Sequence, residues 1–159
     1  MSDVREARAD DVPVLVAMMD EFYAEAGFTL DRRVARTSFE AVIADRRLGR
    51  VWLVEAEGEA VGYLVETLVF AMDHGGTTAV VDDFFVRPRW RGKGLGTAAL
   101  AHVRRHCLAH GVRAMRVEVG HDNAVAQAVY RRNGFDVVDH RLMATTLVAP
   151  SPGEPPGPV

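Results

Sequence analysis

One glycine-rich stretch follows an apolar segment and opens a helical pattern, and its residue types suit the binding of an anion. The stretch consists of Arg91, Gly92, Lys93, Gly94, Leu95, Gly96 and Thr97. The first N–H groups of a helix have no partner within the helix, and the helix dipole adds a partial positive charge there. Glycines let phosphate oxygens approach the backbone closely. The stretch therefore predicts a phosphate-binding turn, with an ordinary tight turn as the alternative.

Two other phosphate-binding motifs do not fit this stretch. A dinucleotide fingerprint needs G-x-G-x-x-G directly at the end of a strand, but Thr97 holds the sixth place and residues 87–91 intervene. A P-loop needs G-x-x-x-x-G-K-[ST], which occurs nowhere in the sequence. Both motifs are excluded as explanations of the glycines.

Two segments of the chain resemble the motifs of the GNAT N-acetyltransferases, in the same order. Residues 86–88, Val-Arg-Pro, followed by residues 91–96, resemble the cofactor motif of that family. Asn123 precedes Tyr130 by seven residues, and with the Gly-Phe pair that follows it is similar to the second motif. The resemblance implies an acetyl-CoA-dependent enzyme whose glycine-rich turn, residues 91–97, holds the pyrophosphate. It also implies direct attack on the thioester by a primary amine of a small molecule, amino acid or peptide.

Tyr130 is the candidate acid that protonates the departing thiolate. It lies almost two helical turns after Asn123, so both side chains share one face of the expected helix. The alternative is a core aromatic whose hydroxyl bonds a backbone group. Asn123 either caps the helix or, as the resemblance implies, binds the pantetheine arm of the cofactor, and both roles can hold.

Asp82 is the candidate base, because an amine with a pKa of about 10 must lose a proton before it attacks. The resemblance often places a glutamate at this position, and the shorter aspartate favours a water relay. Two alternatives stay open: Asp82 binds a cationic acceptor, or it pairs with a neighbouring arginine. Asp83 is expected to point to the opposite face of the strand, because strand side chains alternate.

The cofactor site is expected to include three more residues and no metal. The resemblance implies that backbone groups of Phe84, Phe85 and Val86, near a bulge in the strand, bind pantetheine and polarise the thioester carbonyl. Three histidines recur every four residues, at 102, 106 and 110, but no carboxylate accompanies them as in H-E-x-x-H. They indicate the edge of an amphipathic helix, and Cys107 on its core side is expected to be buried and inert.

Periodicity and turn residues predict the elements that position these groups. The helices are expected to begin after Asp11, Asp31, Gly94 and Asn123. The expected strands are residues 4–8, 51–56, 60–70, 79–86, 114–119, 135–138 and 142–148, with a loop at 73–78. This order predicts one α/β N-acetyltransferase domain, residues 1–149, with a mixed, mostly antiparallel sheet flanked by helices. By resemblance, two strands splay to admit the cofactor.

Composition narrows the classes of protein that remain. The 159 residues are 48% hydrophobic and 26% charged, with a net charge of -3, one cysteine and no apolar run long enough to cross a membrane. Residues 150–159 hold five of the seven prolines and are expected to be a disordered tail. The first residues lack a secretory pattern, so a cytoplasmic protein is expected.

Two other function classes compete with the enzyme. A non-catalytic acyl-CoA-binding or sensing module would keep residues 91–96 and could dispense with Tyr130. A nucleic-acid-binding domain is disfavoured by the net charge. The resemblance makes a homodimer plausible, and a cationic amine acceptor is suggested by acidic residues near the expected cleft: Asp20, Glu21, Glu25, Glu66 and Asp82.

Overall fold

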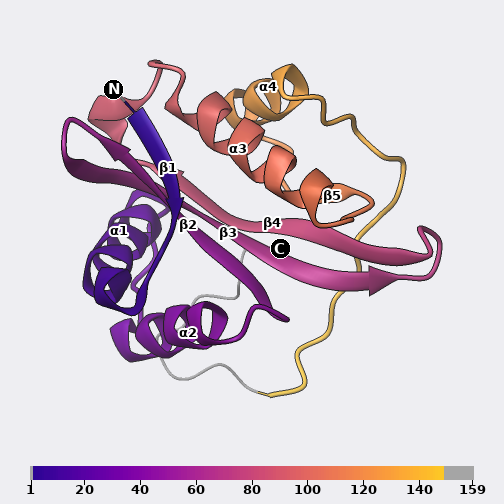
Figure 1. The fold of residues 1–159 in the computed structure, drawn as a ribbon, viewed down its shortest axis with the longest axis horizontal. Helices are drawn as coiled ribbons and strands as arrows, with labels where there is room; N and C mark the ends of the chain where they lie inside the picture. The colour runs from indigo at the N-terminus through magenta and orange to yellow at the C-terminus, as the bar shows by residue number, and fades with distance from the viewer. Residues whose placement is uncertain (1, 149–159) are drawn as a thin grey trace.

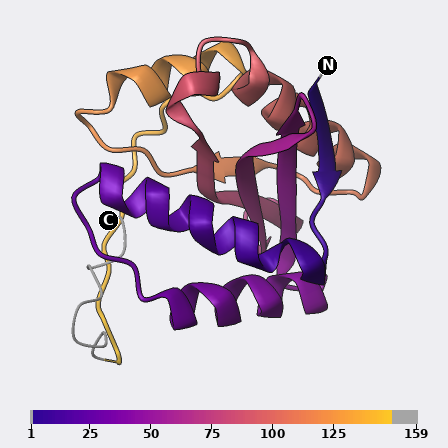
Figure 2. The ribbon, with the colours of Figure 1, turned by 90° about the vertical axis from the view of Figure 1, so that its left-hand side faces the viewer.

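The computed structural model describes residues 2–148 and shows a five-stranded sheet in the order β1-β2-β3-β4-β5. All neighbouring strands pair antiparallel except β4 and β5, which are parallel. Helices α1 and α2 cover one face of the sheet, and α3 and α4 lie over the other (Figures 1 and 2). The predicted mixed, mostly antiparallel sheet flanked by helices is confirmed.

The first helical layer begins at the residues that the sequence predicts, Asp11 and Asp31, but the Asp11 side chain makes no cap hydrogen bond to α1. Strand β1 (Ser2–Glu6) leads through a 3-10 turn (Ala9–Asp11) into α1 (Val12–Glu25). Helix α2 (Arg32–Ala44) begins at Asp31, whose side chain accepts a hydrogen bond from the Arg33 backbone N–H at 2.9 Å. Such a cap satisfies a backbone donor that would otherwise lack a partner. Both predicted helices are present, and their apolar stripes form one of two cores.

The three central strands are long, and their pairing is irregular at two places, at Val54–Glu55 of β2 and in β4 opposite Val65–Glu66 of β3. Strand β2 (Gly49–Ala56) pairs with β3 (Glu59–Ala71), which pairs with β4 (Gly76–Val86). The loop expected at 73–78 is shorter, because Gly76 and Thr77 already continue the ladder with Ala71 and Phe70. Between β3 and β4 the register steps from Val65↔Asp83 to Glu66↔Val81, which leaves Asp82 as an extra residue. This step is a β-bulge.

The second half of the chain carries the glycine-rich turn and the opening between two strands. A 3-10 turn (Pro88–Trp90) precedes α3 (Leu95–Ala109), β5 (Met115–Val117) and α4 (Ala124–Arg132). Strands β4 and β5 pair only from Ala79 to Val81 and from Met115 to Val117. Within residues 2–148 no pairing continues beyond Val81 and Val117, so the strands separate there. The predicted splay is confirmed.

The strands predicted at 135–138 and 142–148 are wrong. These residues form no strand in the structure, and the segment runs from α4 along the outside of the molecule (Figure 1). Alternating apolar residues favour a strand only where a ladder partner exists, and β5 offers an edge of just three residues. Val137 and Met143 are accordingly 77% and 91% exposed. The tail predicted at 150–159 lies outside the described residues.

Candidate active site

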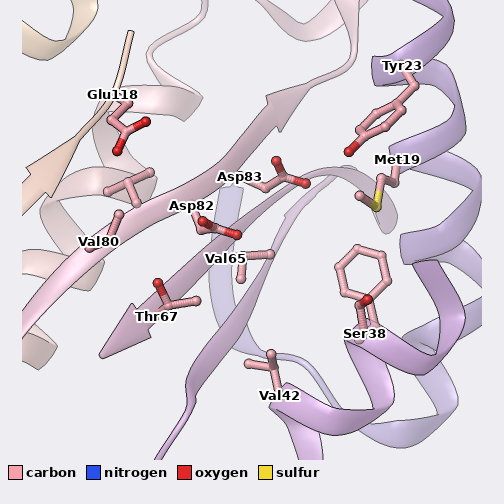
Figure 3. A pocket seen from close by; sticks show the side chains of 12 residues that line it. Met19, Tyr23, Ser38, Val42, Val65, Thr67, Val80, Asp82, Asp83 and Glu118 are labelled. Carbon is pink, nitrogen blue, oxygen red and sulfur yellow. The ribbon is translucent and has the colours of Figure 1, made fainter. Parts of the chain in front are cut away.

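The bulge in β4 turns two neighbouring carboxylates toward the same cavity. Asp82 and Asp83 both line it, together with residues of α1 and α2 (Figure 3). The expectation that Asp83 faces the opposite side of the sheet is therefore wrong. Alternation of side chains holds for a regular strand, whereas a bulge inserts one residue and lets successive side chains share a face.

The cavity has a volume of about 320 Å³ and is built by segments far apart in the sequence. Met19 and Tyr23 come from α1, and Glu118 follows β5 where it leaves β4 (Figure 3). The remaining lining residues are Ser38, Phe39, Val42, Val65, Thr67, Val80, Val81, Asp82 and Asp83. The cavity thus lies between the α1–α2 layer and the point where β4 and β5 separate.

Asp83 has the electrostatic environment of a base. It is half-buried, and one carboxylate oxygen accepts a hydrogen bond from the hydroxyl of buried Tyr63 at 3.1 Å. Burial raises the pKa of Asp83 to about 6, with a smaller upward contribution from the charge of Asp82 and an opposing one from the Tyr63 hydrogen bond. At neutral pH Asp83 is ionised and able to accept a proton. Its perturbed pKa and its place in the cavity together make Asp83 a candidate functional residue.

Tyr130 interacts electrostatically with Asp83. Its ring lies 6.5 Å from the Phe84 ring and 5.5 Å from the Phe135 ring, measured between centroids. Burial and the charge of Asp83 raise the pKa of Tyr130 to about 12, so the phenol keeps its proton. In the described part of the chain its hydroxyl makes no hydrogen bond, unlike the backbone-bonded core tyrosine considered as the alternative.

The glycine-rich turn presents open backbone at the start of α3. Gly92 and Gly94 have φ of +72° and +81°, a region that favours glycine, and no described atom lies within 4 Å of where their Cβ atoms would stand. Gly94 is the N-cap of α3 and provides no side-chain cap. The first N–H groups of α3 are therefore uncovered by a cap, and the turn fits a pyrophosphate group.

The two cations of the turn are held by neighbours. The Arg91 guanidinium donates to both carboxylate oxygens of Glu25 in α1 at 2.6 and 2.7 Å and to the Val86 carbonyl at 2.7 Å. The ammonium of Lys93 stands 4.6 Å from the centre of the Trp90 ring. Trp90 is buried beneath this contact. The structure therefore shows Arg91 joining the turn to α1, rather than pointing its guanidinium freely into solvent.

The backbone of β4 beyond the bulge forms the wall next to the opening. Phe84 packs with the α3 and α4 layer, whereas Phe85 is buried in the α1 and α2 core. The Val86 carbonyl is already the acceptor for Arg91. Asn123 caps α4, since its side-chain oxygen accepts from the Ala126 N–H at 3.0 Å. The capping alternative for Asn123 is confirmed, and its pantetheine contact stays a prediction.

Of the acidic residues expected near the cleft, only Asp82 lines the cavity. Asp20, Glu21 and Glu25 form ion pairs with Arg32, Arg87 and Arg91. Glu66 is buried on the other face of the sheet, where it accepts a hydrogen bond from the Trp52 indole at 2.9 Å.

Sequence reasoning missed Glu118, Asp83 and Tyr63 as members of the site. Glu118 had a usable signal, because it directly follows β5 at the carboxyl end of a parallel pair, where ligands bind in open α/β sheets. The common orientation of Asp82 and Asp83 could not be predicted from the neighbouring residues, because the bulge depends on the pairing with β3.

The three histidines of α3 pack against an aromatic residue and one another. The rings of His102 and His106 lie 5.0 and 4.8 Å from the Trp52 ring, and His110 stacks on His106 at 4.0 Å. Cys107 is buried as expected, and burial raises its thiol pKa to about 12. Among residues 2–148 no group of three or more His, Cys, Asp or Glu could hold a metal ion. The same residues contain no helix both long and apolar enough to span a membrane.

Known proteins resemble this chain in sequence and in fold. The family model described as Acetyltransferase (GNAT) family matches residues 15–135. The uncharacterized N-acetyltransferase YhfO of Bacillus subtilis (strain 168) is 23% identical over 137 residues, 84% of this chain and 89% of that protein. Mycothiol acetyltransferase of Streptomyces bingchenggensis (strain BCW-1) is 36% identical over 107 residues, 63% of this chain and 33% of that longer protein.

A solved structure extends the similarity to nearly the whole chain. The integron cassette protein HFX_CASS3, from the mobile metagenome of Cole Harbour Salt Marsh, is 48% identical with a TM-score of 0.86. The alignment covers 92% of this chain and 91% of that one. The family match includes the glycine-rich turn, the bulged strand and Tyr130. The chain therefore belongs to the GNAT family of acetyltransferases, which take the acetyl group from acetyl-CoA.

Proposed function

We propose that this protein transfers the acetyl group of acetyl-CoA to a primary amine by direct attack of the amine on the thioester. One observation carries the proposal: a half-buried carboxylate with a pKa of about 6, Asp83, is coupled electrostatically to Tyr130 where β4 and β5 separate. A base and an acid on either side of the expected reaction point are what acyl transfer to an amine requires.

The base in this proposal is Asp83. A bound ammonium group gives its proton to the Asp83 carboxylate, directly or through one water, and the neutral nitrogen then attacks the thioester carbon. The second proton that the nitrogen loses as the amide forms passes to water. Asp82 remains the other candidate for this role. It is exposed at the cavity, which suits attraction of the ammonium more than proton transfer.

Tyr130 is the proposed acid. As the bond between carbon and sulfur breaks, the phenol gives its proton to the sulfur and later regains one from solvent. A phenol with a pKa of about 12 is a weak acid, but part of that shift comes from the negative charge of Asp83. Once Asp83 has taken the amine's proton, that charge is gone and Tyr130 becomes a stronger acid. The two proton transfers therefore assist one another.

Acetyl-CoA supplies the activated acetyl group in this scheme. Residues 91–97 would hold its pyrophosphate at the start of α3, where the uncapped N–H groups and the glycines with positive φ lie. Backbone groups of Phe84, Phe85 and Val86 would bind the pantetheine arm along the edge of β4 that β5 leaves unpaired in the described structure. Asn123 would add a contact from the end of α4.

Thiol release from acetyl-CoA in the presence of a panel of amines tests the proposal, with mass spectrometry of the amine as the second readout. The expected result is amine-dependent thiol release with one acetyl group added to the nitrogen. CoA binding without acetylation of any amine would instead support an acyl-CoA-binding module.

A further inference from the structure

The cavity beside Asp83 has two chemically different sides. Met19 of α1, Val42 of α2 and Val65 of β3 contribute apolar side chains, Phe39 contributes a ring, and the hydroxyl-bearing Tyr23, Ser38 and Thr67 lie among them. Asp82, Asp83 and Glu118 contribute carboxylates from the β4 and β5 side (Figure 3). An acceptor that fills this cavity must therefore match charge at one end and an apolar surface at the other.

We infer that the acceptor is a compact primary amine on a short linker to an apolar arm, such as an aralkylamine or a branched alkylamine. The inference rests on the proposed function and specifies its substrate class. The ammonium group lies at Asp83, and the arm lies along Met19 and Val42, away from the opening between β4 and β5.

The distribution of charge selects a cation. Three carboxylates line the cavity, and none of the described lining residues is a lysine, arginine or histidine. Asp82 and Glu118 are exposed, whereas Asp83 is half-buried. Exposed acids attract a cation toward the cavity, and the half-buried one holds it close to the reaction point. An acceptor carrying its own carboxylate would meet like charge and is disfavoured.

The apolar side of the cavity and its volume favour an acceptor with a small apolar group. At about 320 Å³ the cavity is at the lower end of the range for small-molecule pockets. Hydroxyl groups set against Met19, Val42 and Val65 would lose hydrogen bonds to water, which is costly. The nearby Ser38 hydroxyl already donates to the Val34 carbonyl at 2.7 Å. A polyhydroxylated acceptor with several ammonium groups therefore fits poorly, whereas a phenyl or branched alkyl group gains by burial.

Calorimetric titration of the CoA-saturated protein with phenethylamine, ethylamine and kanamycin tests the inference independently of turnover. Phenethylamine and ethylamine carry the same ammonium group, so their difference isolates the arm. Phenethylamine is expected to bind roughly tenfold to a hundredfold more tightly than ethylamine, from the apolar area that it buries. Affinities of the two amines within threefold of each other, or tighter binding of kanamycin, would overturn the inference.

A matched pair of variants on α2 tests whether the apolar side of the cavity causes the preference for phenethylamine over ethylamine. Val42→Thr places a hydroxyl on the apolar side at nearly constant volume and is expected to cut the advantage of phenethylamine by at least threefold. Val34→Thr makes the same change on the same helix at a residue that is 41% exposed and not among those lining the cavity, and should leave the ratio unchanged. Met19→Gln provides a second change on the apolar side should Val42→Thr lower the melting temperature.

The measurements distinguish failure of the proposed function from failure of the inferred acceptor class. If no amine releases thiol from acetyl-CoA, the proposed function is wrong, and the calorimetric ratio still decides the chemistry of the cavity. If thiol is released but kanamycin is the better substrate by kcat/KM, the function stands and the inferred acceptor class is wrong. An equal loss of the phenethylamine advantage in both valine variants would also overturn the inference.

Discussion

The glycine-rich turn and the acceptor cavity are built in opposite ways. The turn is one continuous stretch, residues 91–97, and its binding groups are backbone N–H groups at the start of α3. The cavity takes side chains from α1, α2, β3 and β4 and from the chain after β5. A site made of consecutive backbone can keep one ligand group across many proteins, whereas a site made of scattered side chains changes whenever one element changes. The first is expected to bind the constant cofactor and the second the variable acceptor.

Two ion pairs join these regions through the last turns of α1. Glu25 binds Arg91 of the turn, and Glu21 binds Arg87 just before it with an oxygen-to-nitrogen distance of 2.7 Å. Helix α1 also supplies Met19 and Tyr23 to the cavity. The same helix, α1, therefore positions both the glycine-rich turn and one side of the acceptor cavity.

Of the proposed substitutions, Gly94→Glu should have the largest effect. It should abolish cofactor binding without changing the acceptor cavity. At φ +81° the new side chain is strained, and its charge repels phosphate at the start of α3. The rise in melting temperature caused by CoA is expected to disappear. Gly111→Glu is the matched control, because Gly111 has φ +74° and equally open surroundings at the other end of α3. A preserved CoA shift in Gly94→Glu would show that the turn does not bind the cofactor.

Tyr130→Phe should reduce turnover while leaving cofactor binding intact. The ring contacts with Phe84 and Phe135 survive, and only the transferable proton is lost. Turnover is expected to fall roughly 10²- to 10⁴-fold, with little change in the CoA dissociation constant, because the interaction belongs to the transition state. Single-turnover thiol release and calorimetry measure the two quantities. Unchanged turnover would make Tyr130 a packing residue.

Asp83→Asn should lower the activity and raise the stability of the protein. Burial raises the pKa of Asp83 from 3.8 to about 6, so the charged form destabilises the fold at neutral pH. The amide removes that charge and can still accept a hydrogen bond from Tyr63, so the variant is expected to be about 1–2 kcal/mol more stable at pH 8. The gain should shrink as pH falls through 6 toward 3.8, where the native carboxyl becomes neutral in both states. Chemical denaturation at several pH values measures this, and a gain independent of pH would contradict the cause.

The sequence predicted the elements whose signals are local. The cap at Asp31, the glycines of the turn and the apolar stripe of α3 each act over a few residues, and each is present in the structure. The strands expected at 135–138 and 142–148 failed, because a strand also needs a partner that local alternation does not reveal. The common orientation of Asp82 and Asp83 was missed for the same reason, since the bulge arises from pairing between β4 and β3.

The dependence of kcat on pH for the native enzyme, Asp83→Asn and Asp82→Asn decides which of the two carboxylates is the base. With a saturating amine, kcat reports ionisations in the bound complex. If Asp83 is the base, native kcat should fall about tenfold per pH unit below a pKa near 6, because protonated Asp83 cannot accept the proton of the amine. Asp82→Asn should keep this acidic limb, and Asp83→Asn should lose it along with most of its activity. A limb that persists unchanged in Asp83→Asn but vanishes in Asp82→Asn would show that Asp83 is not the base and assign that role to Asp82.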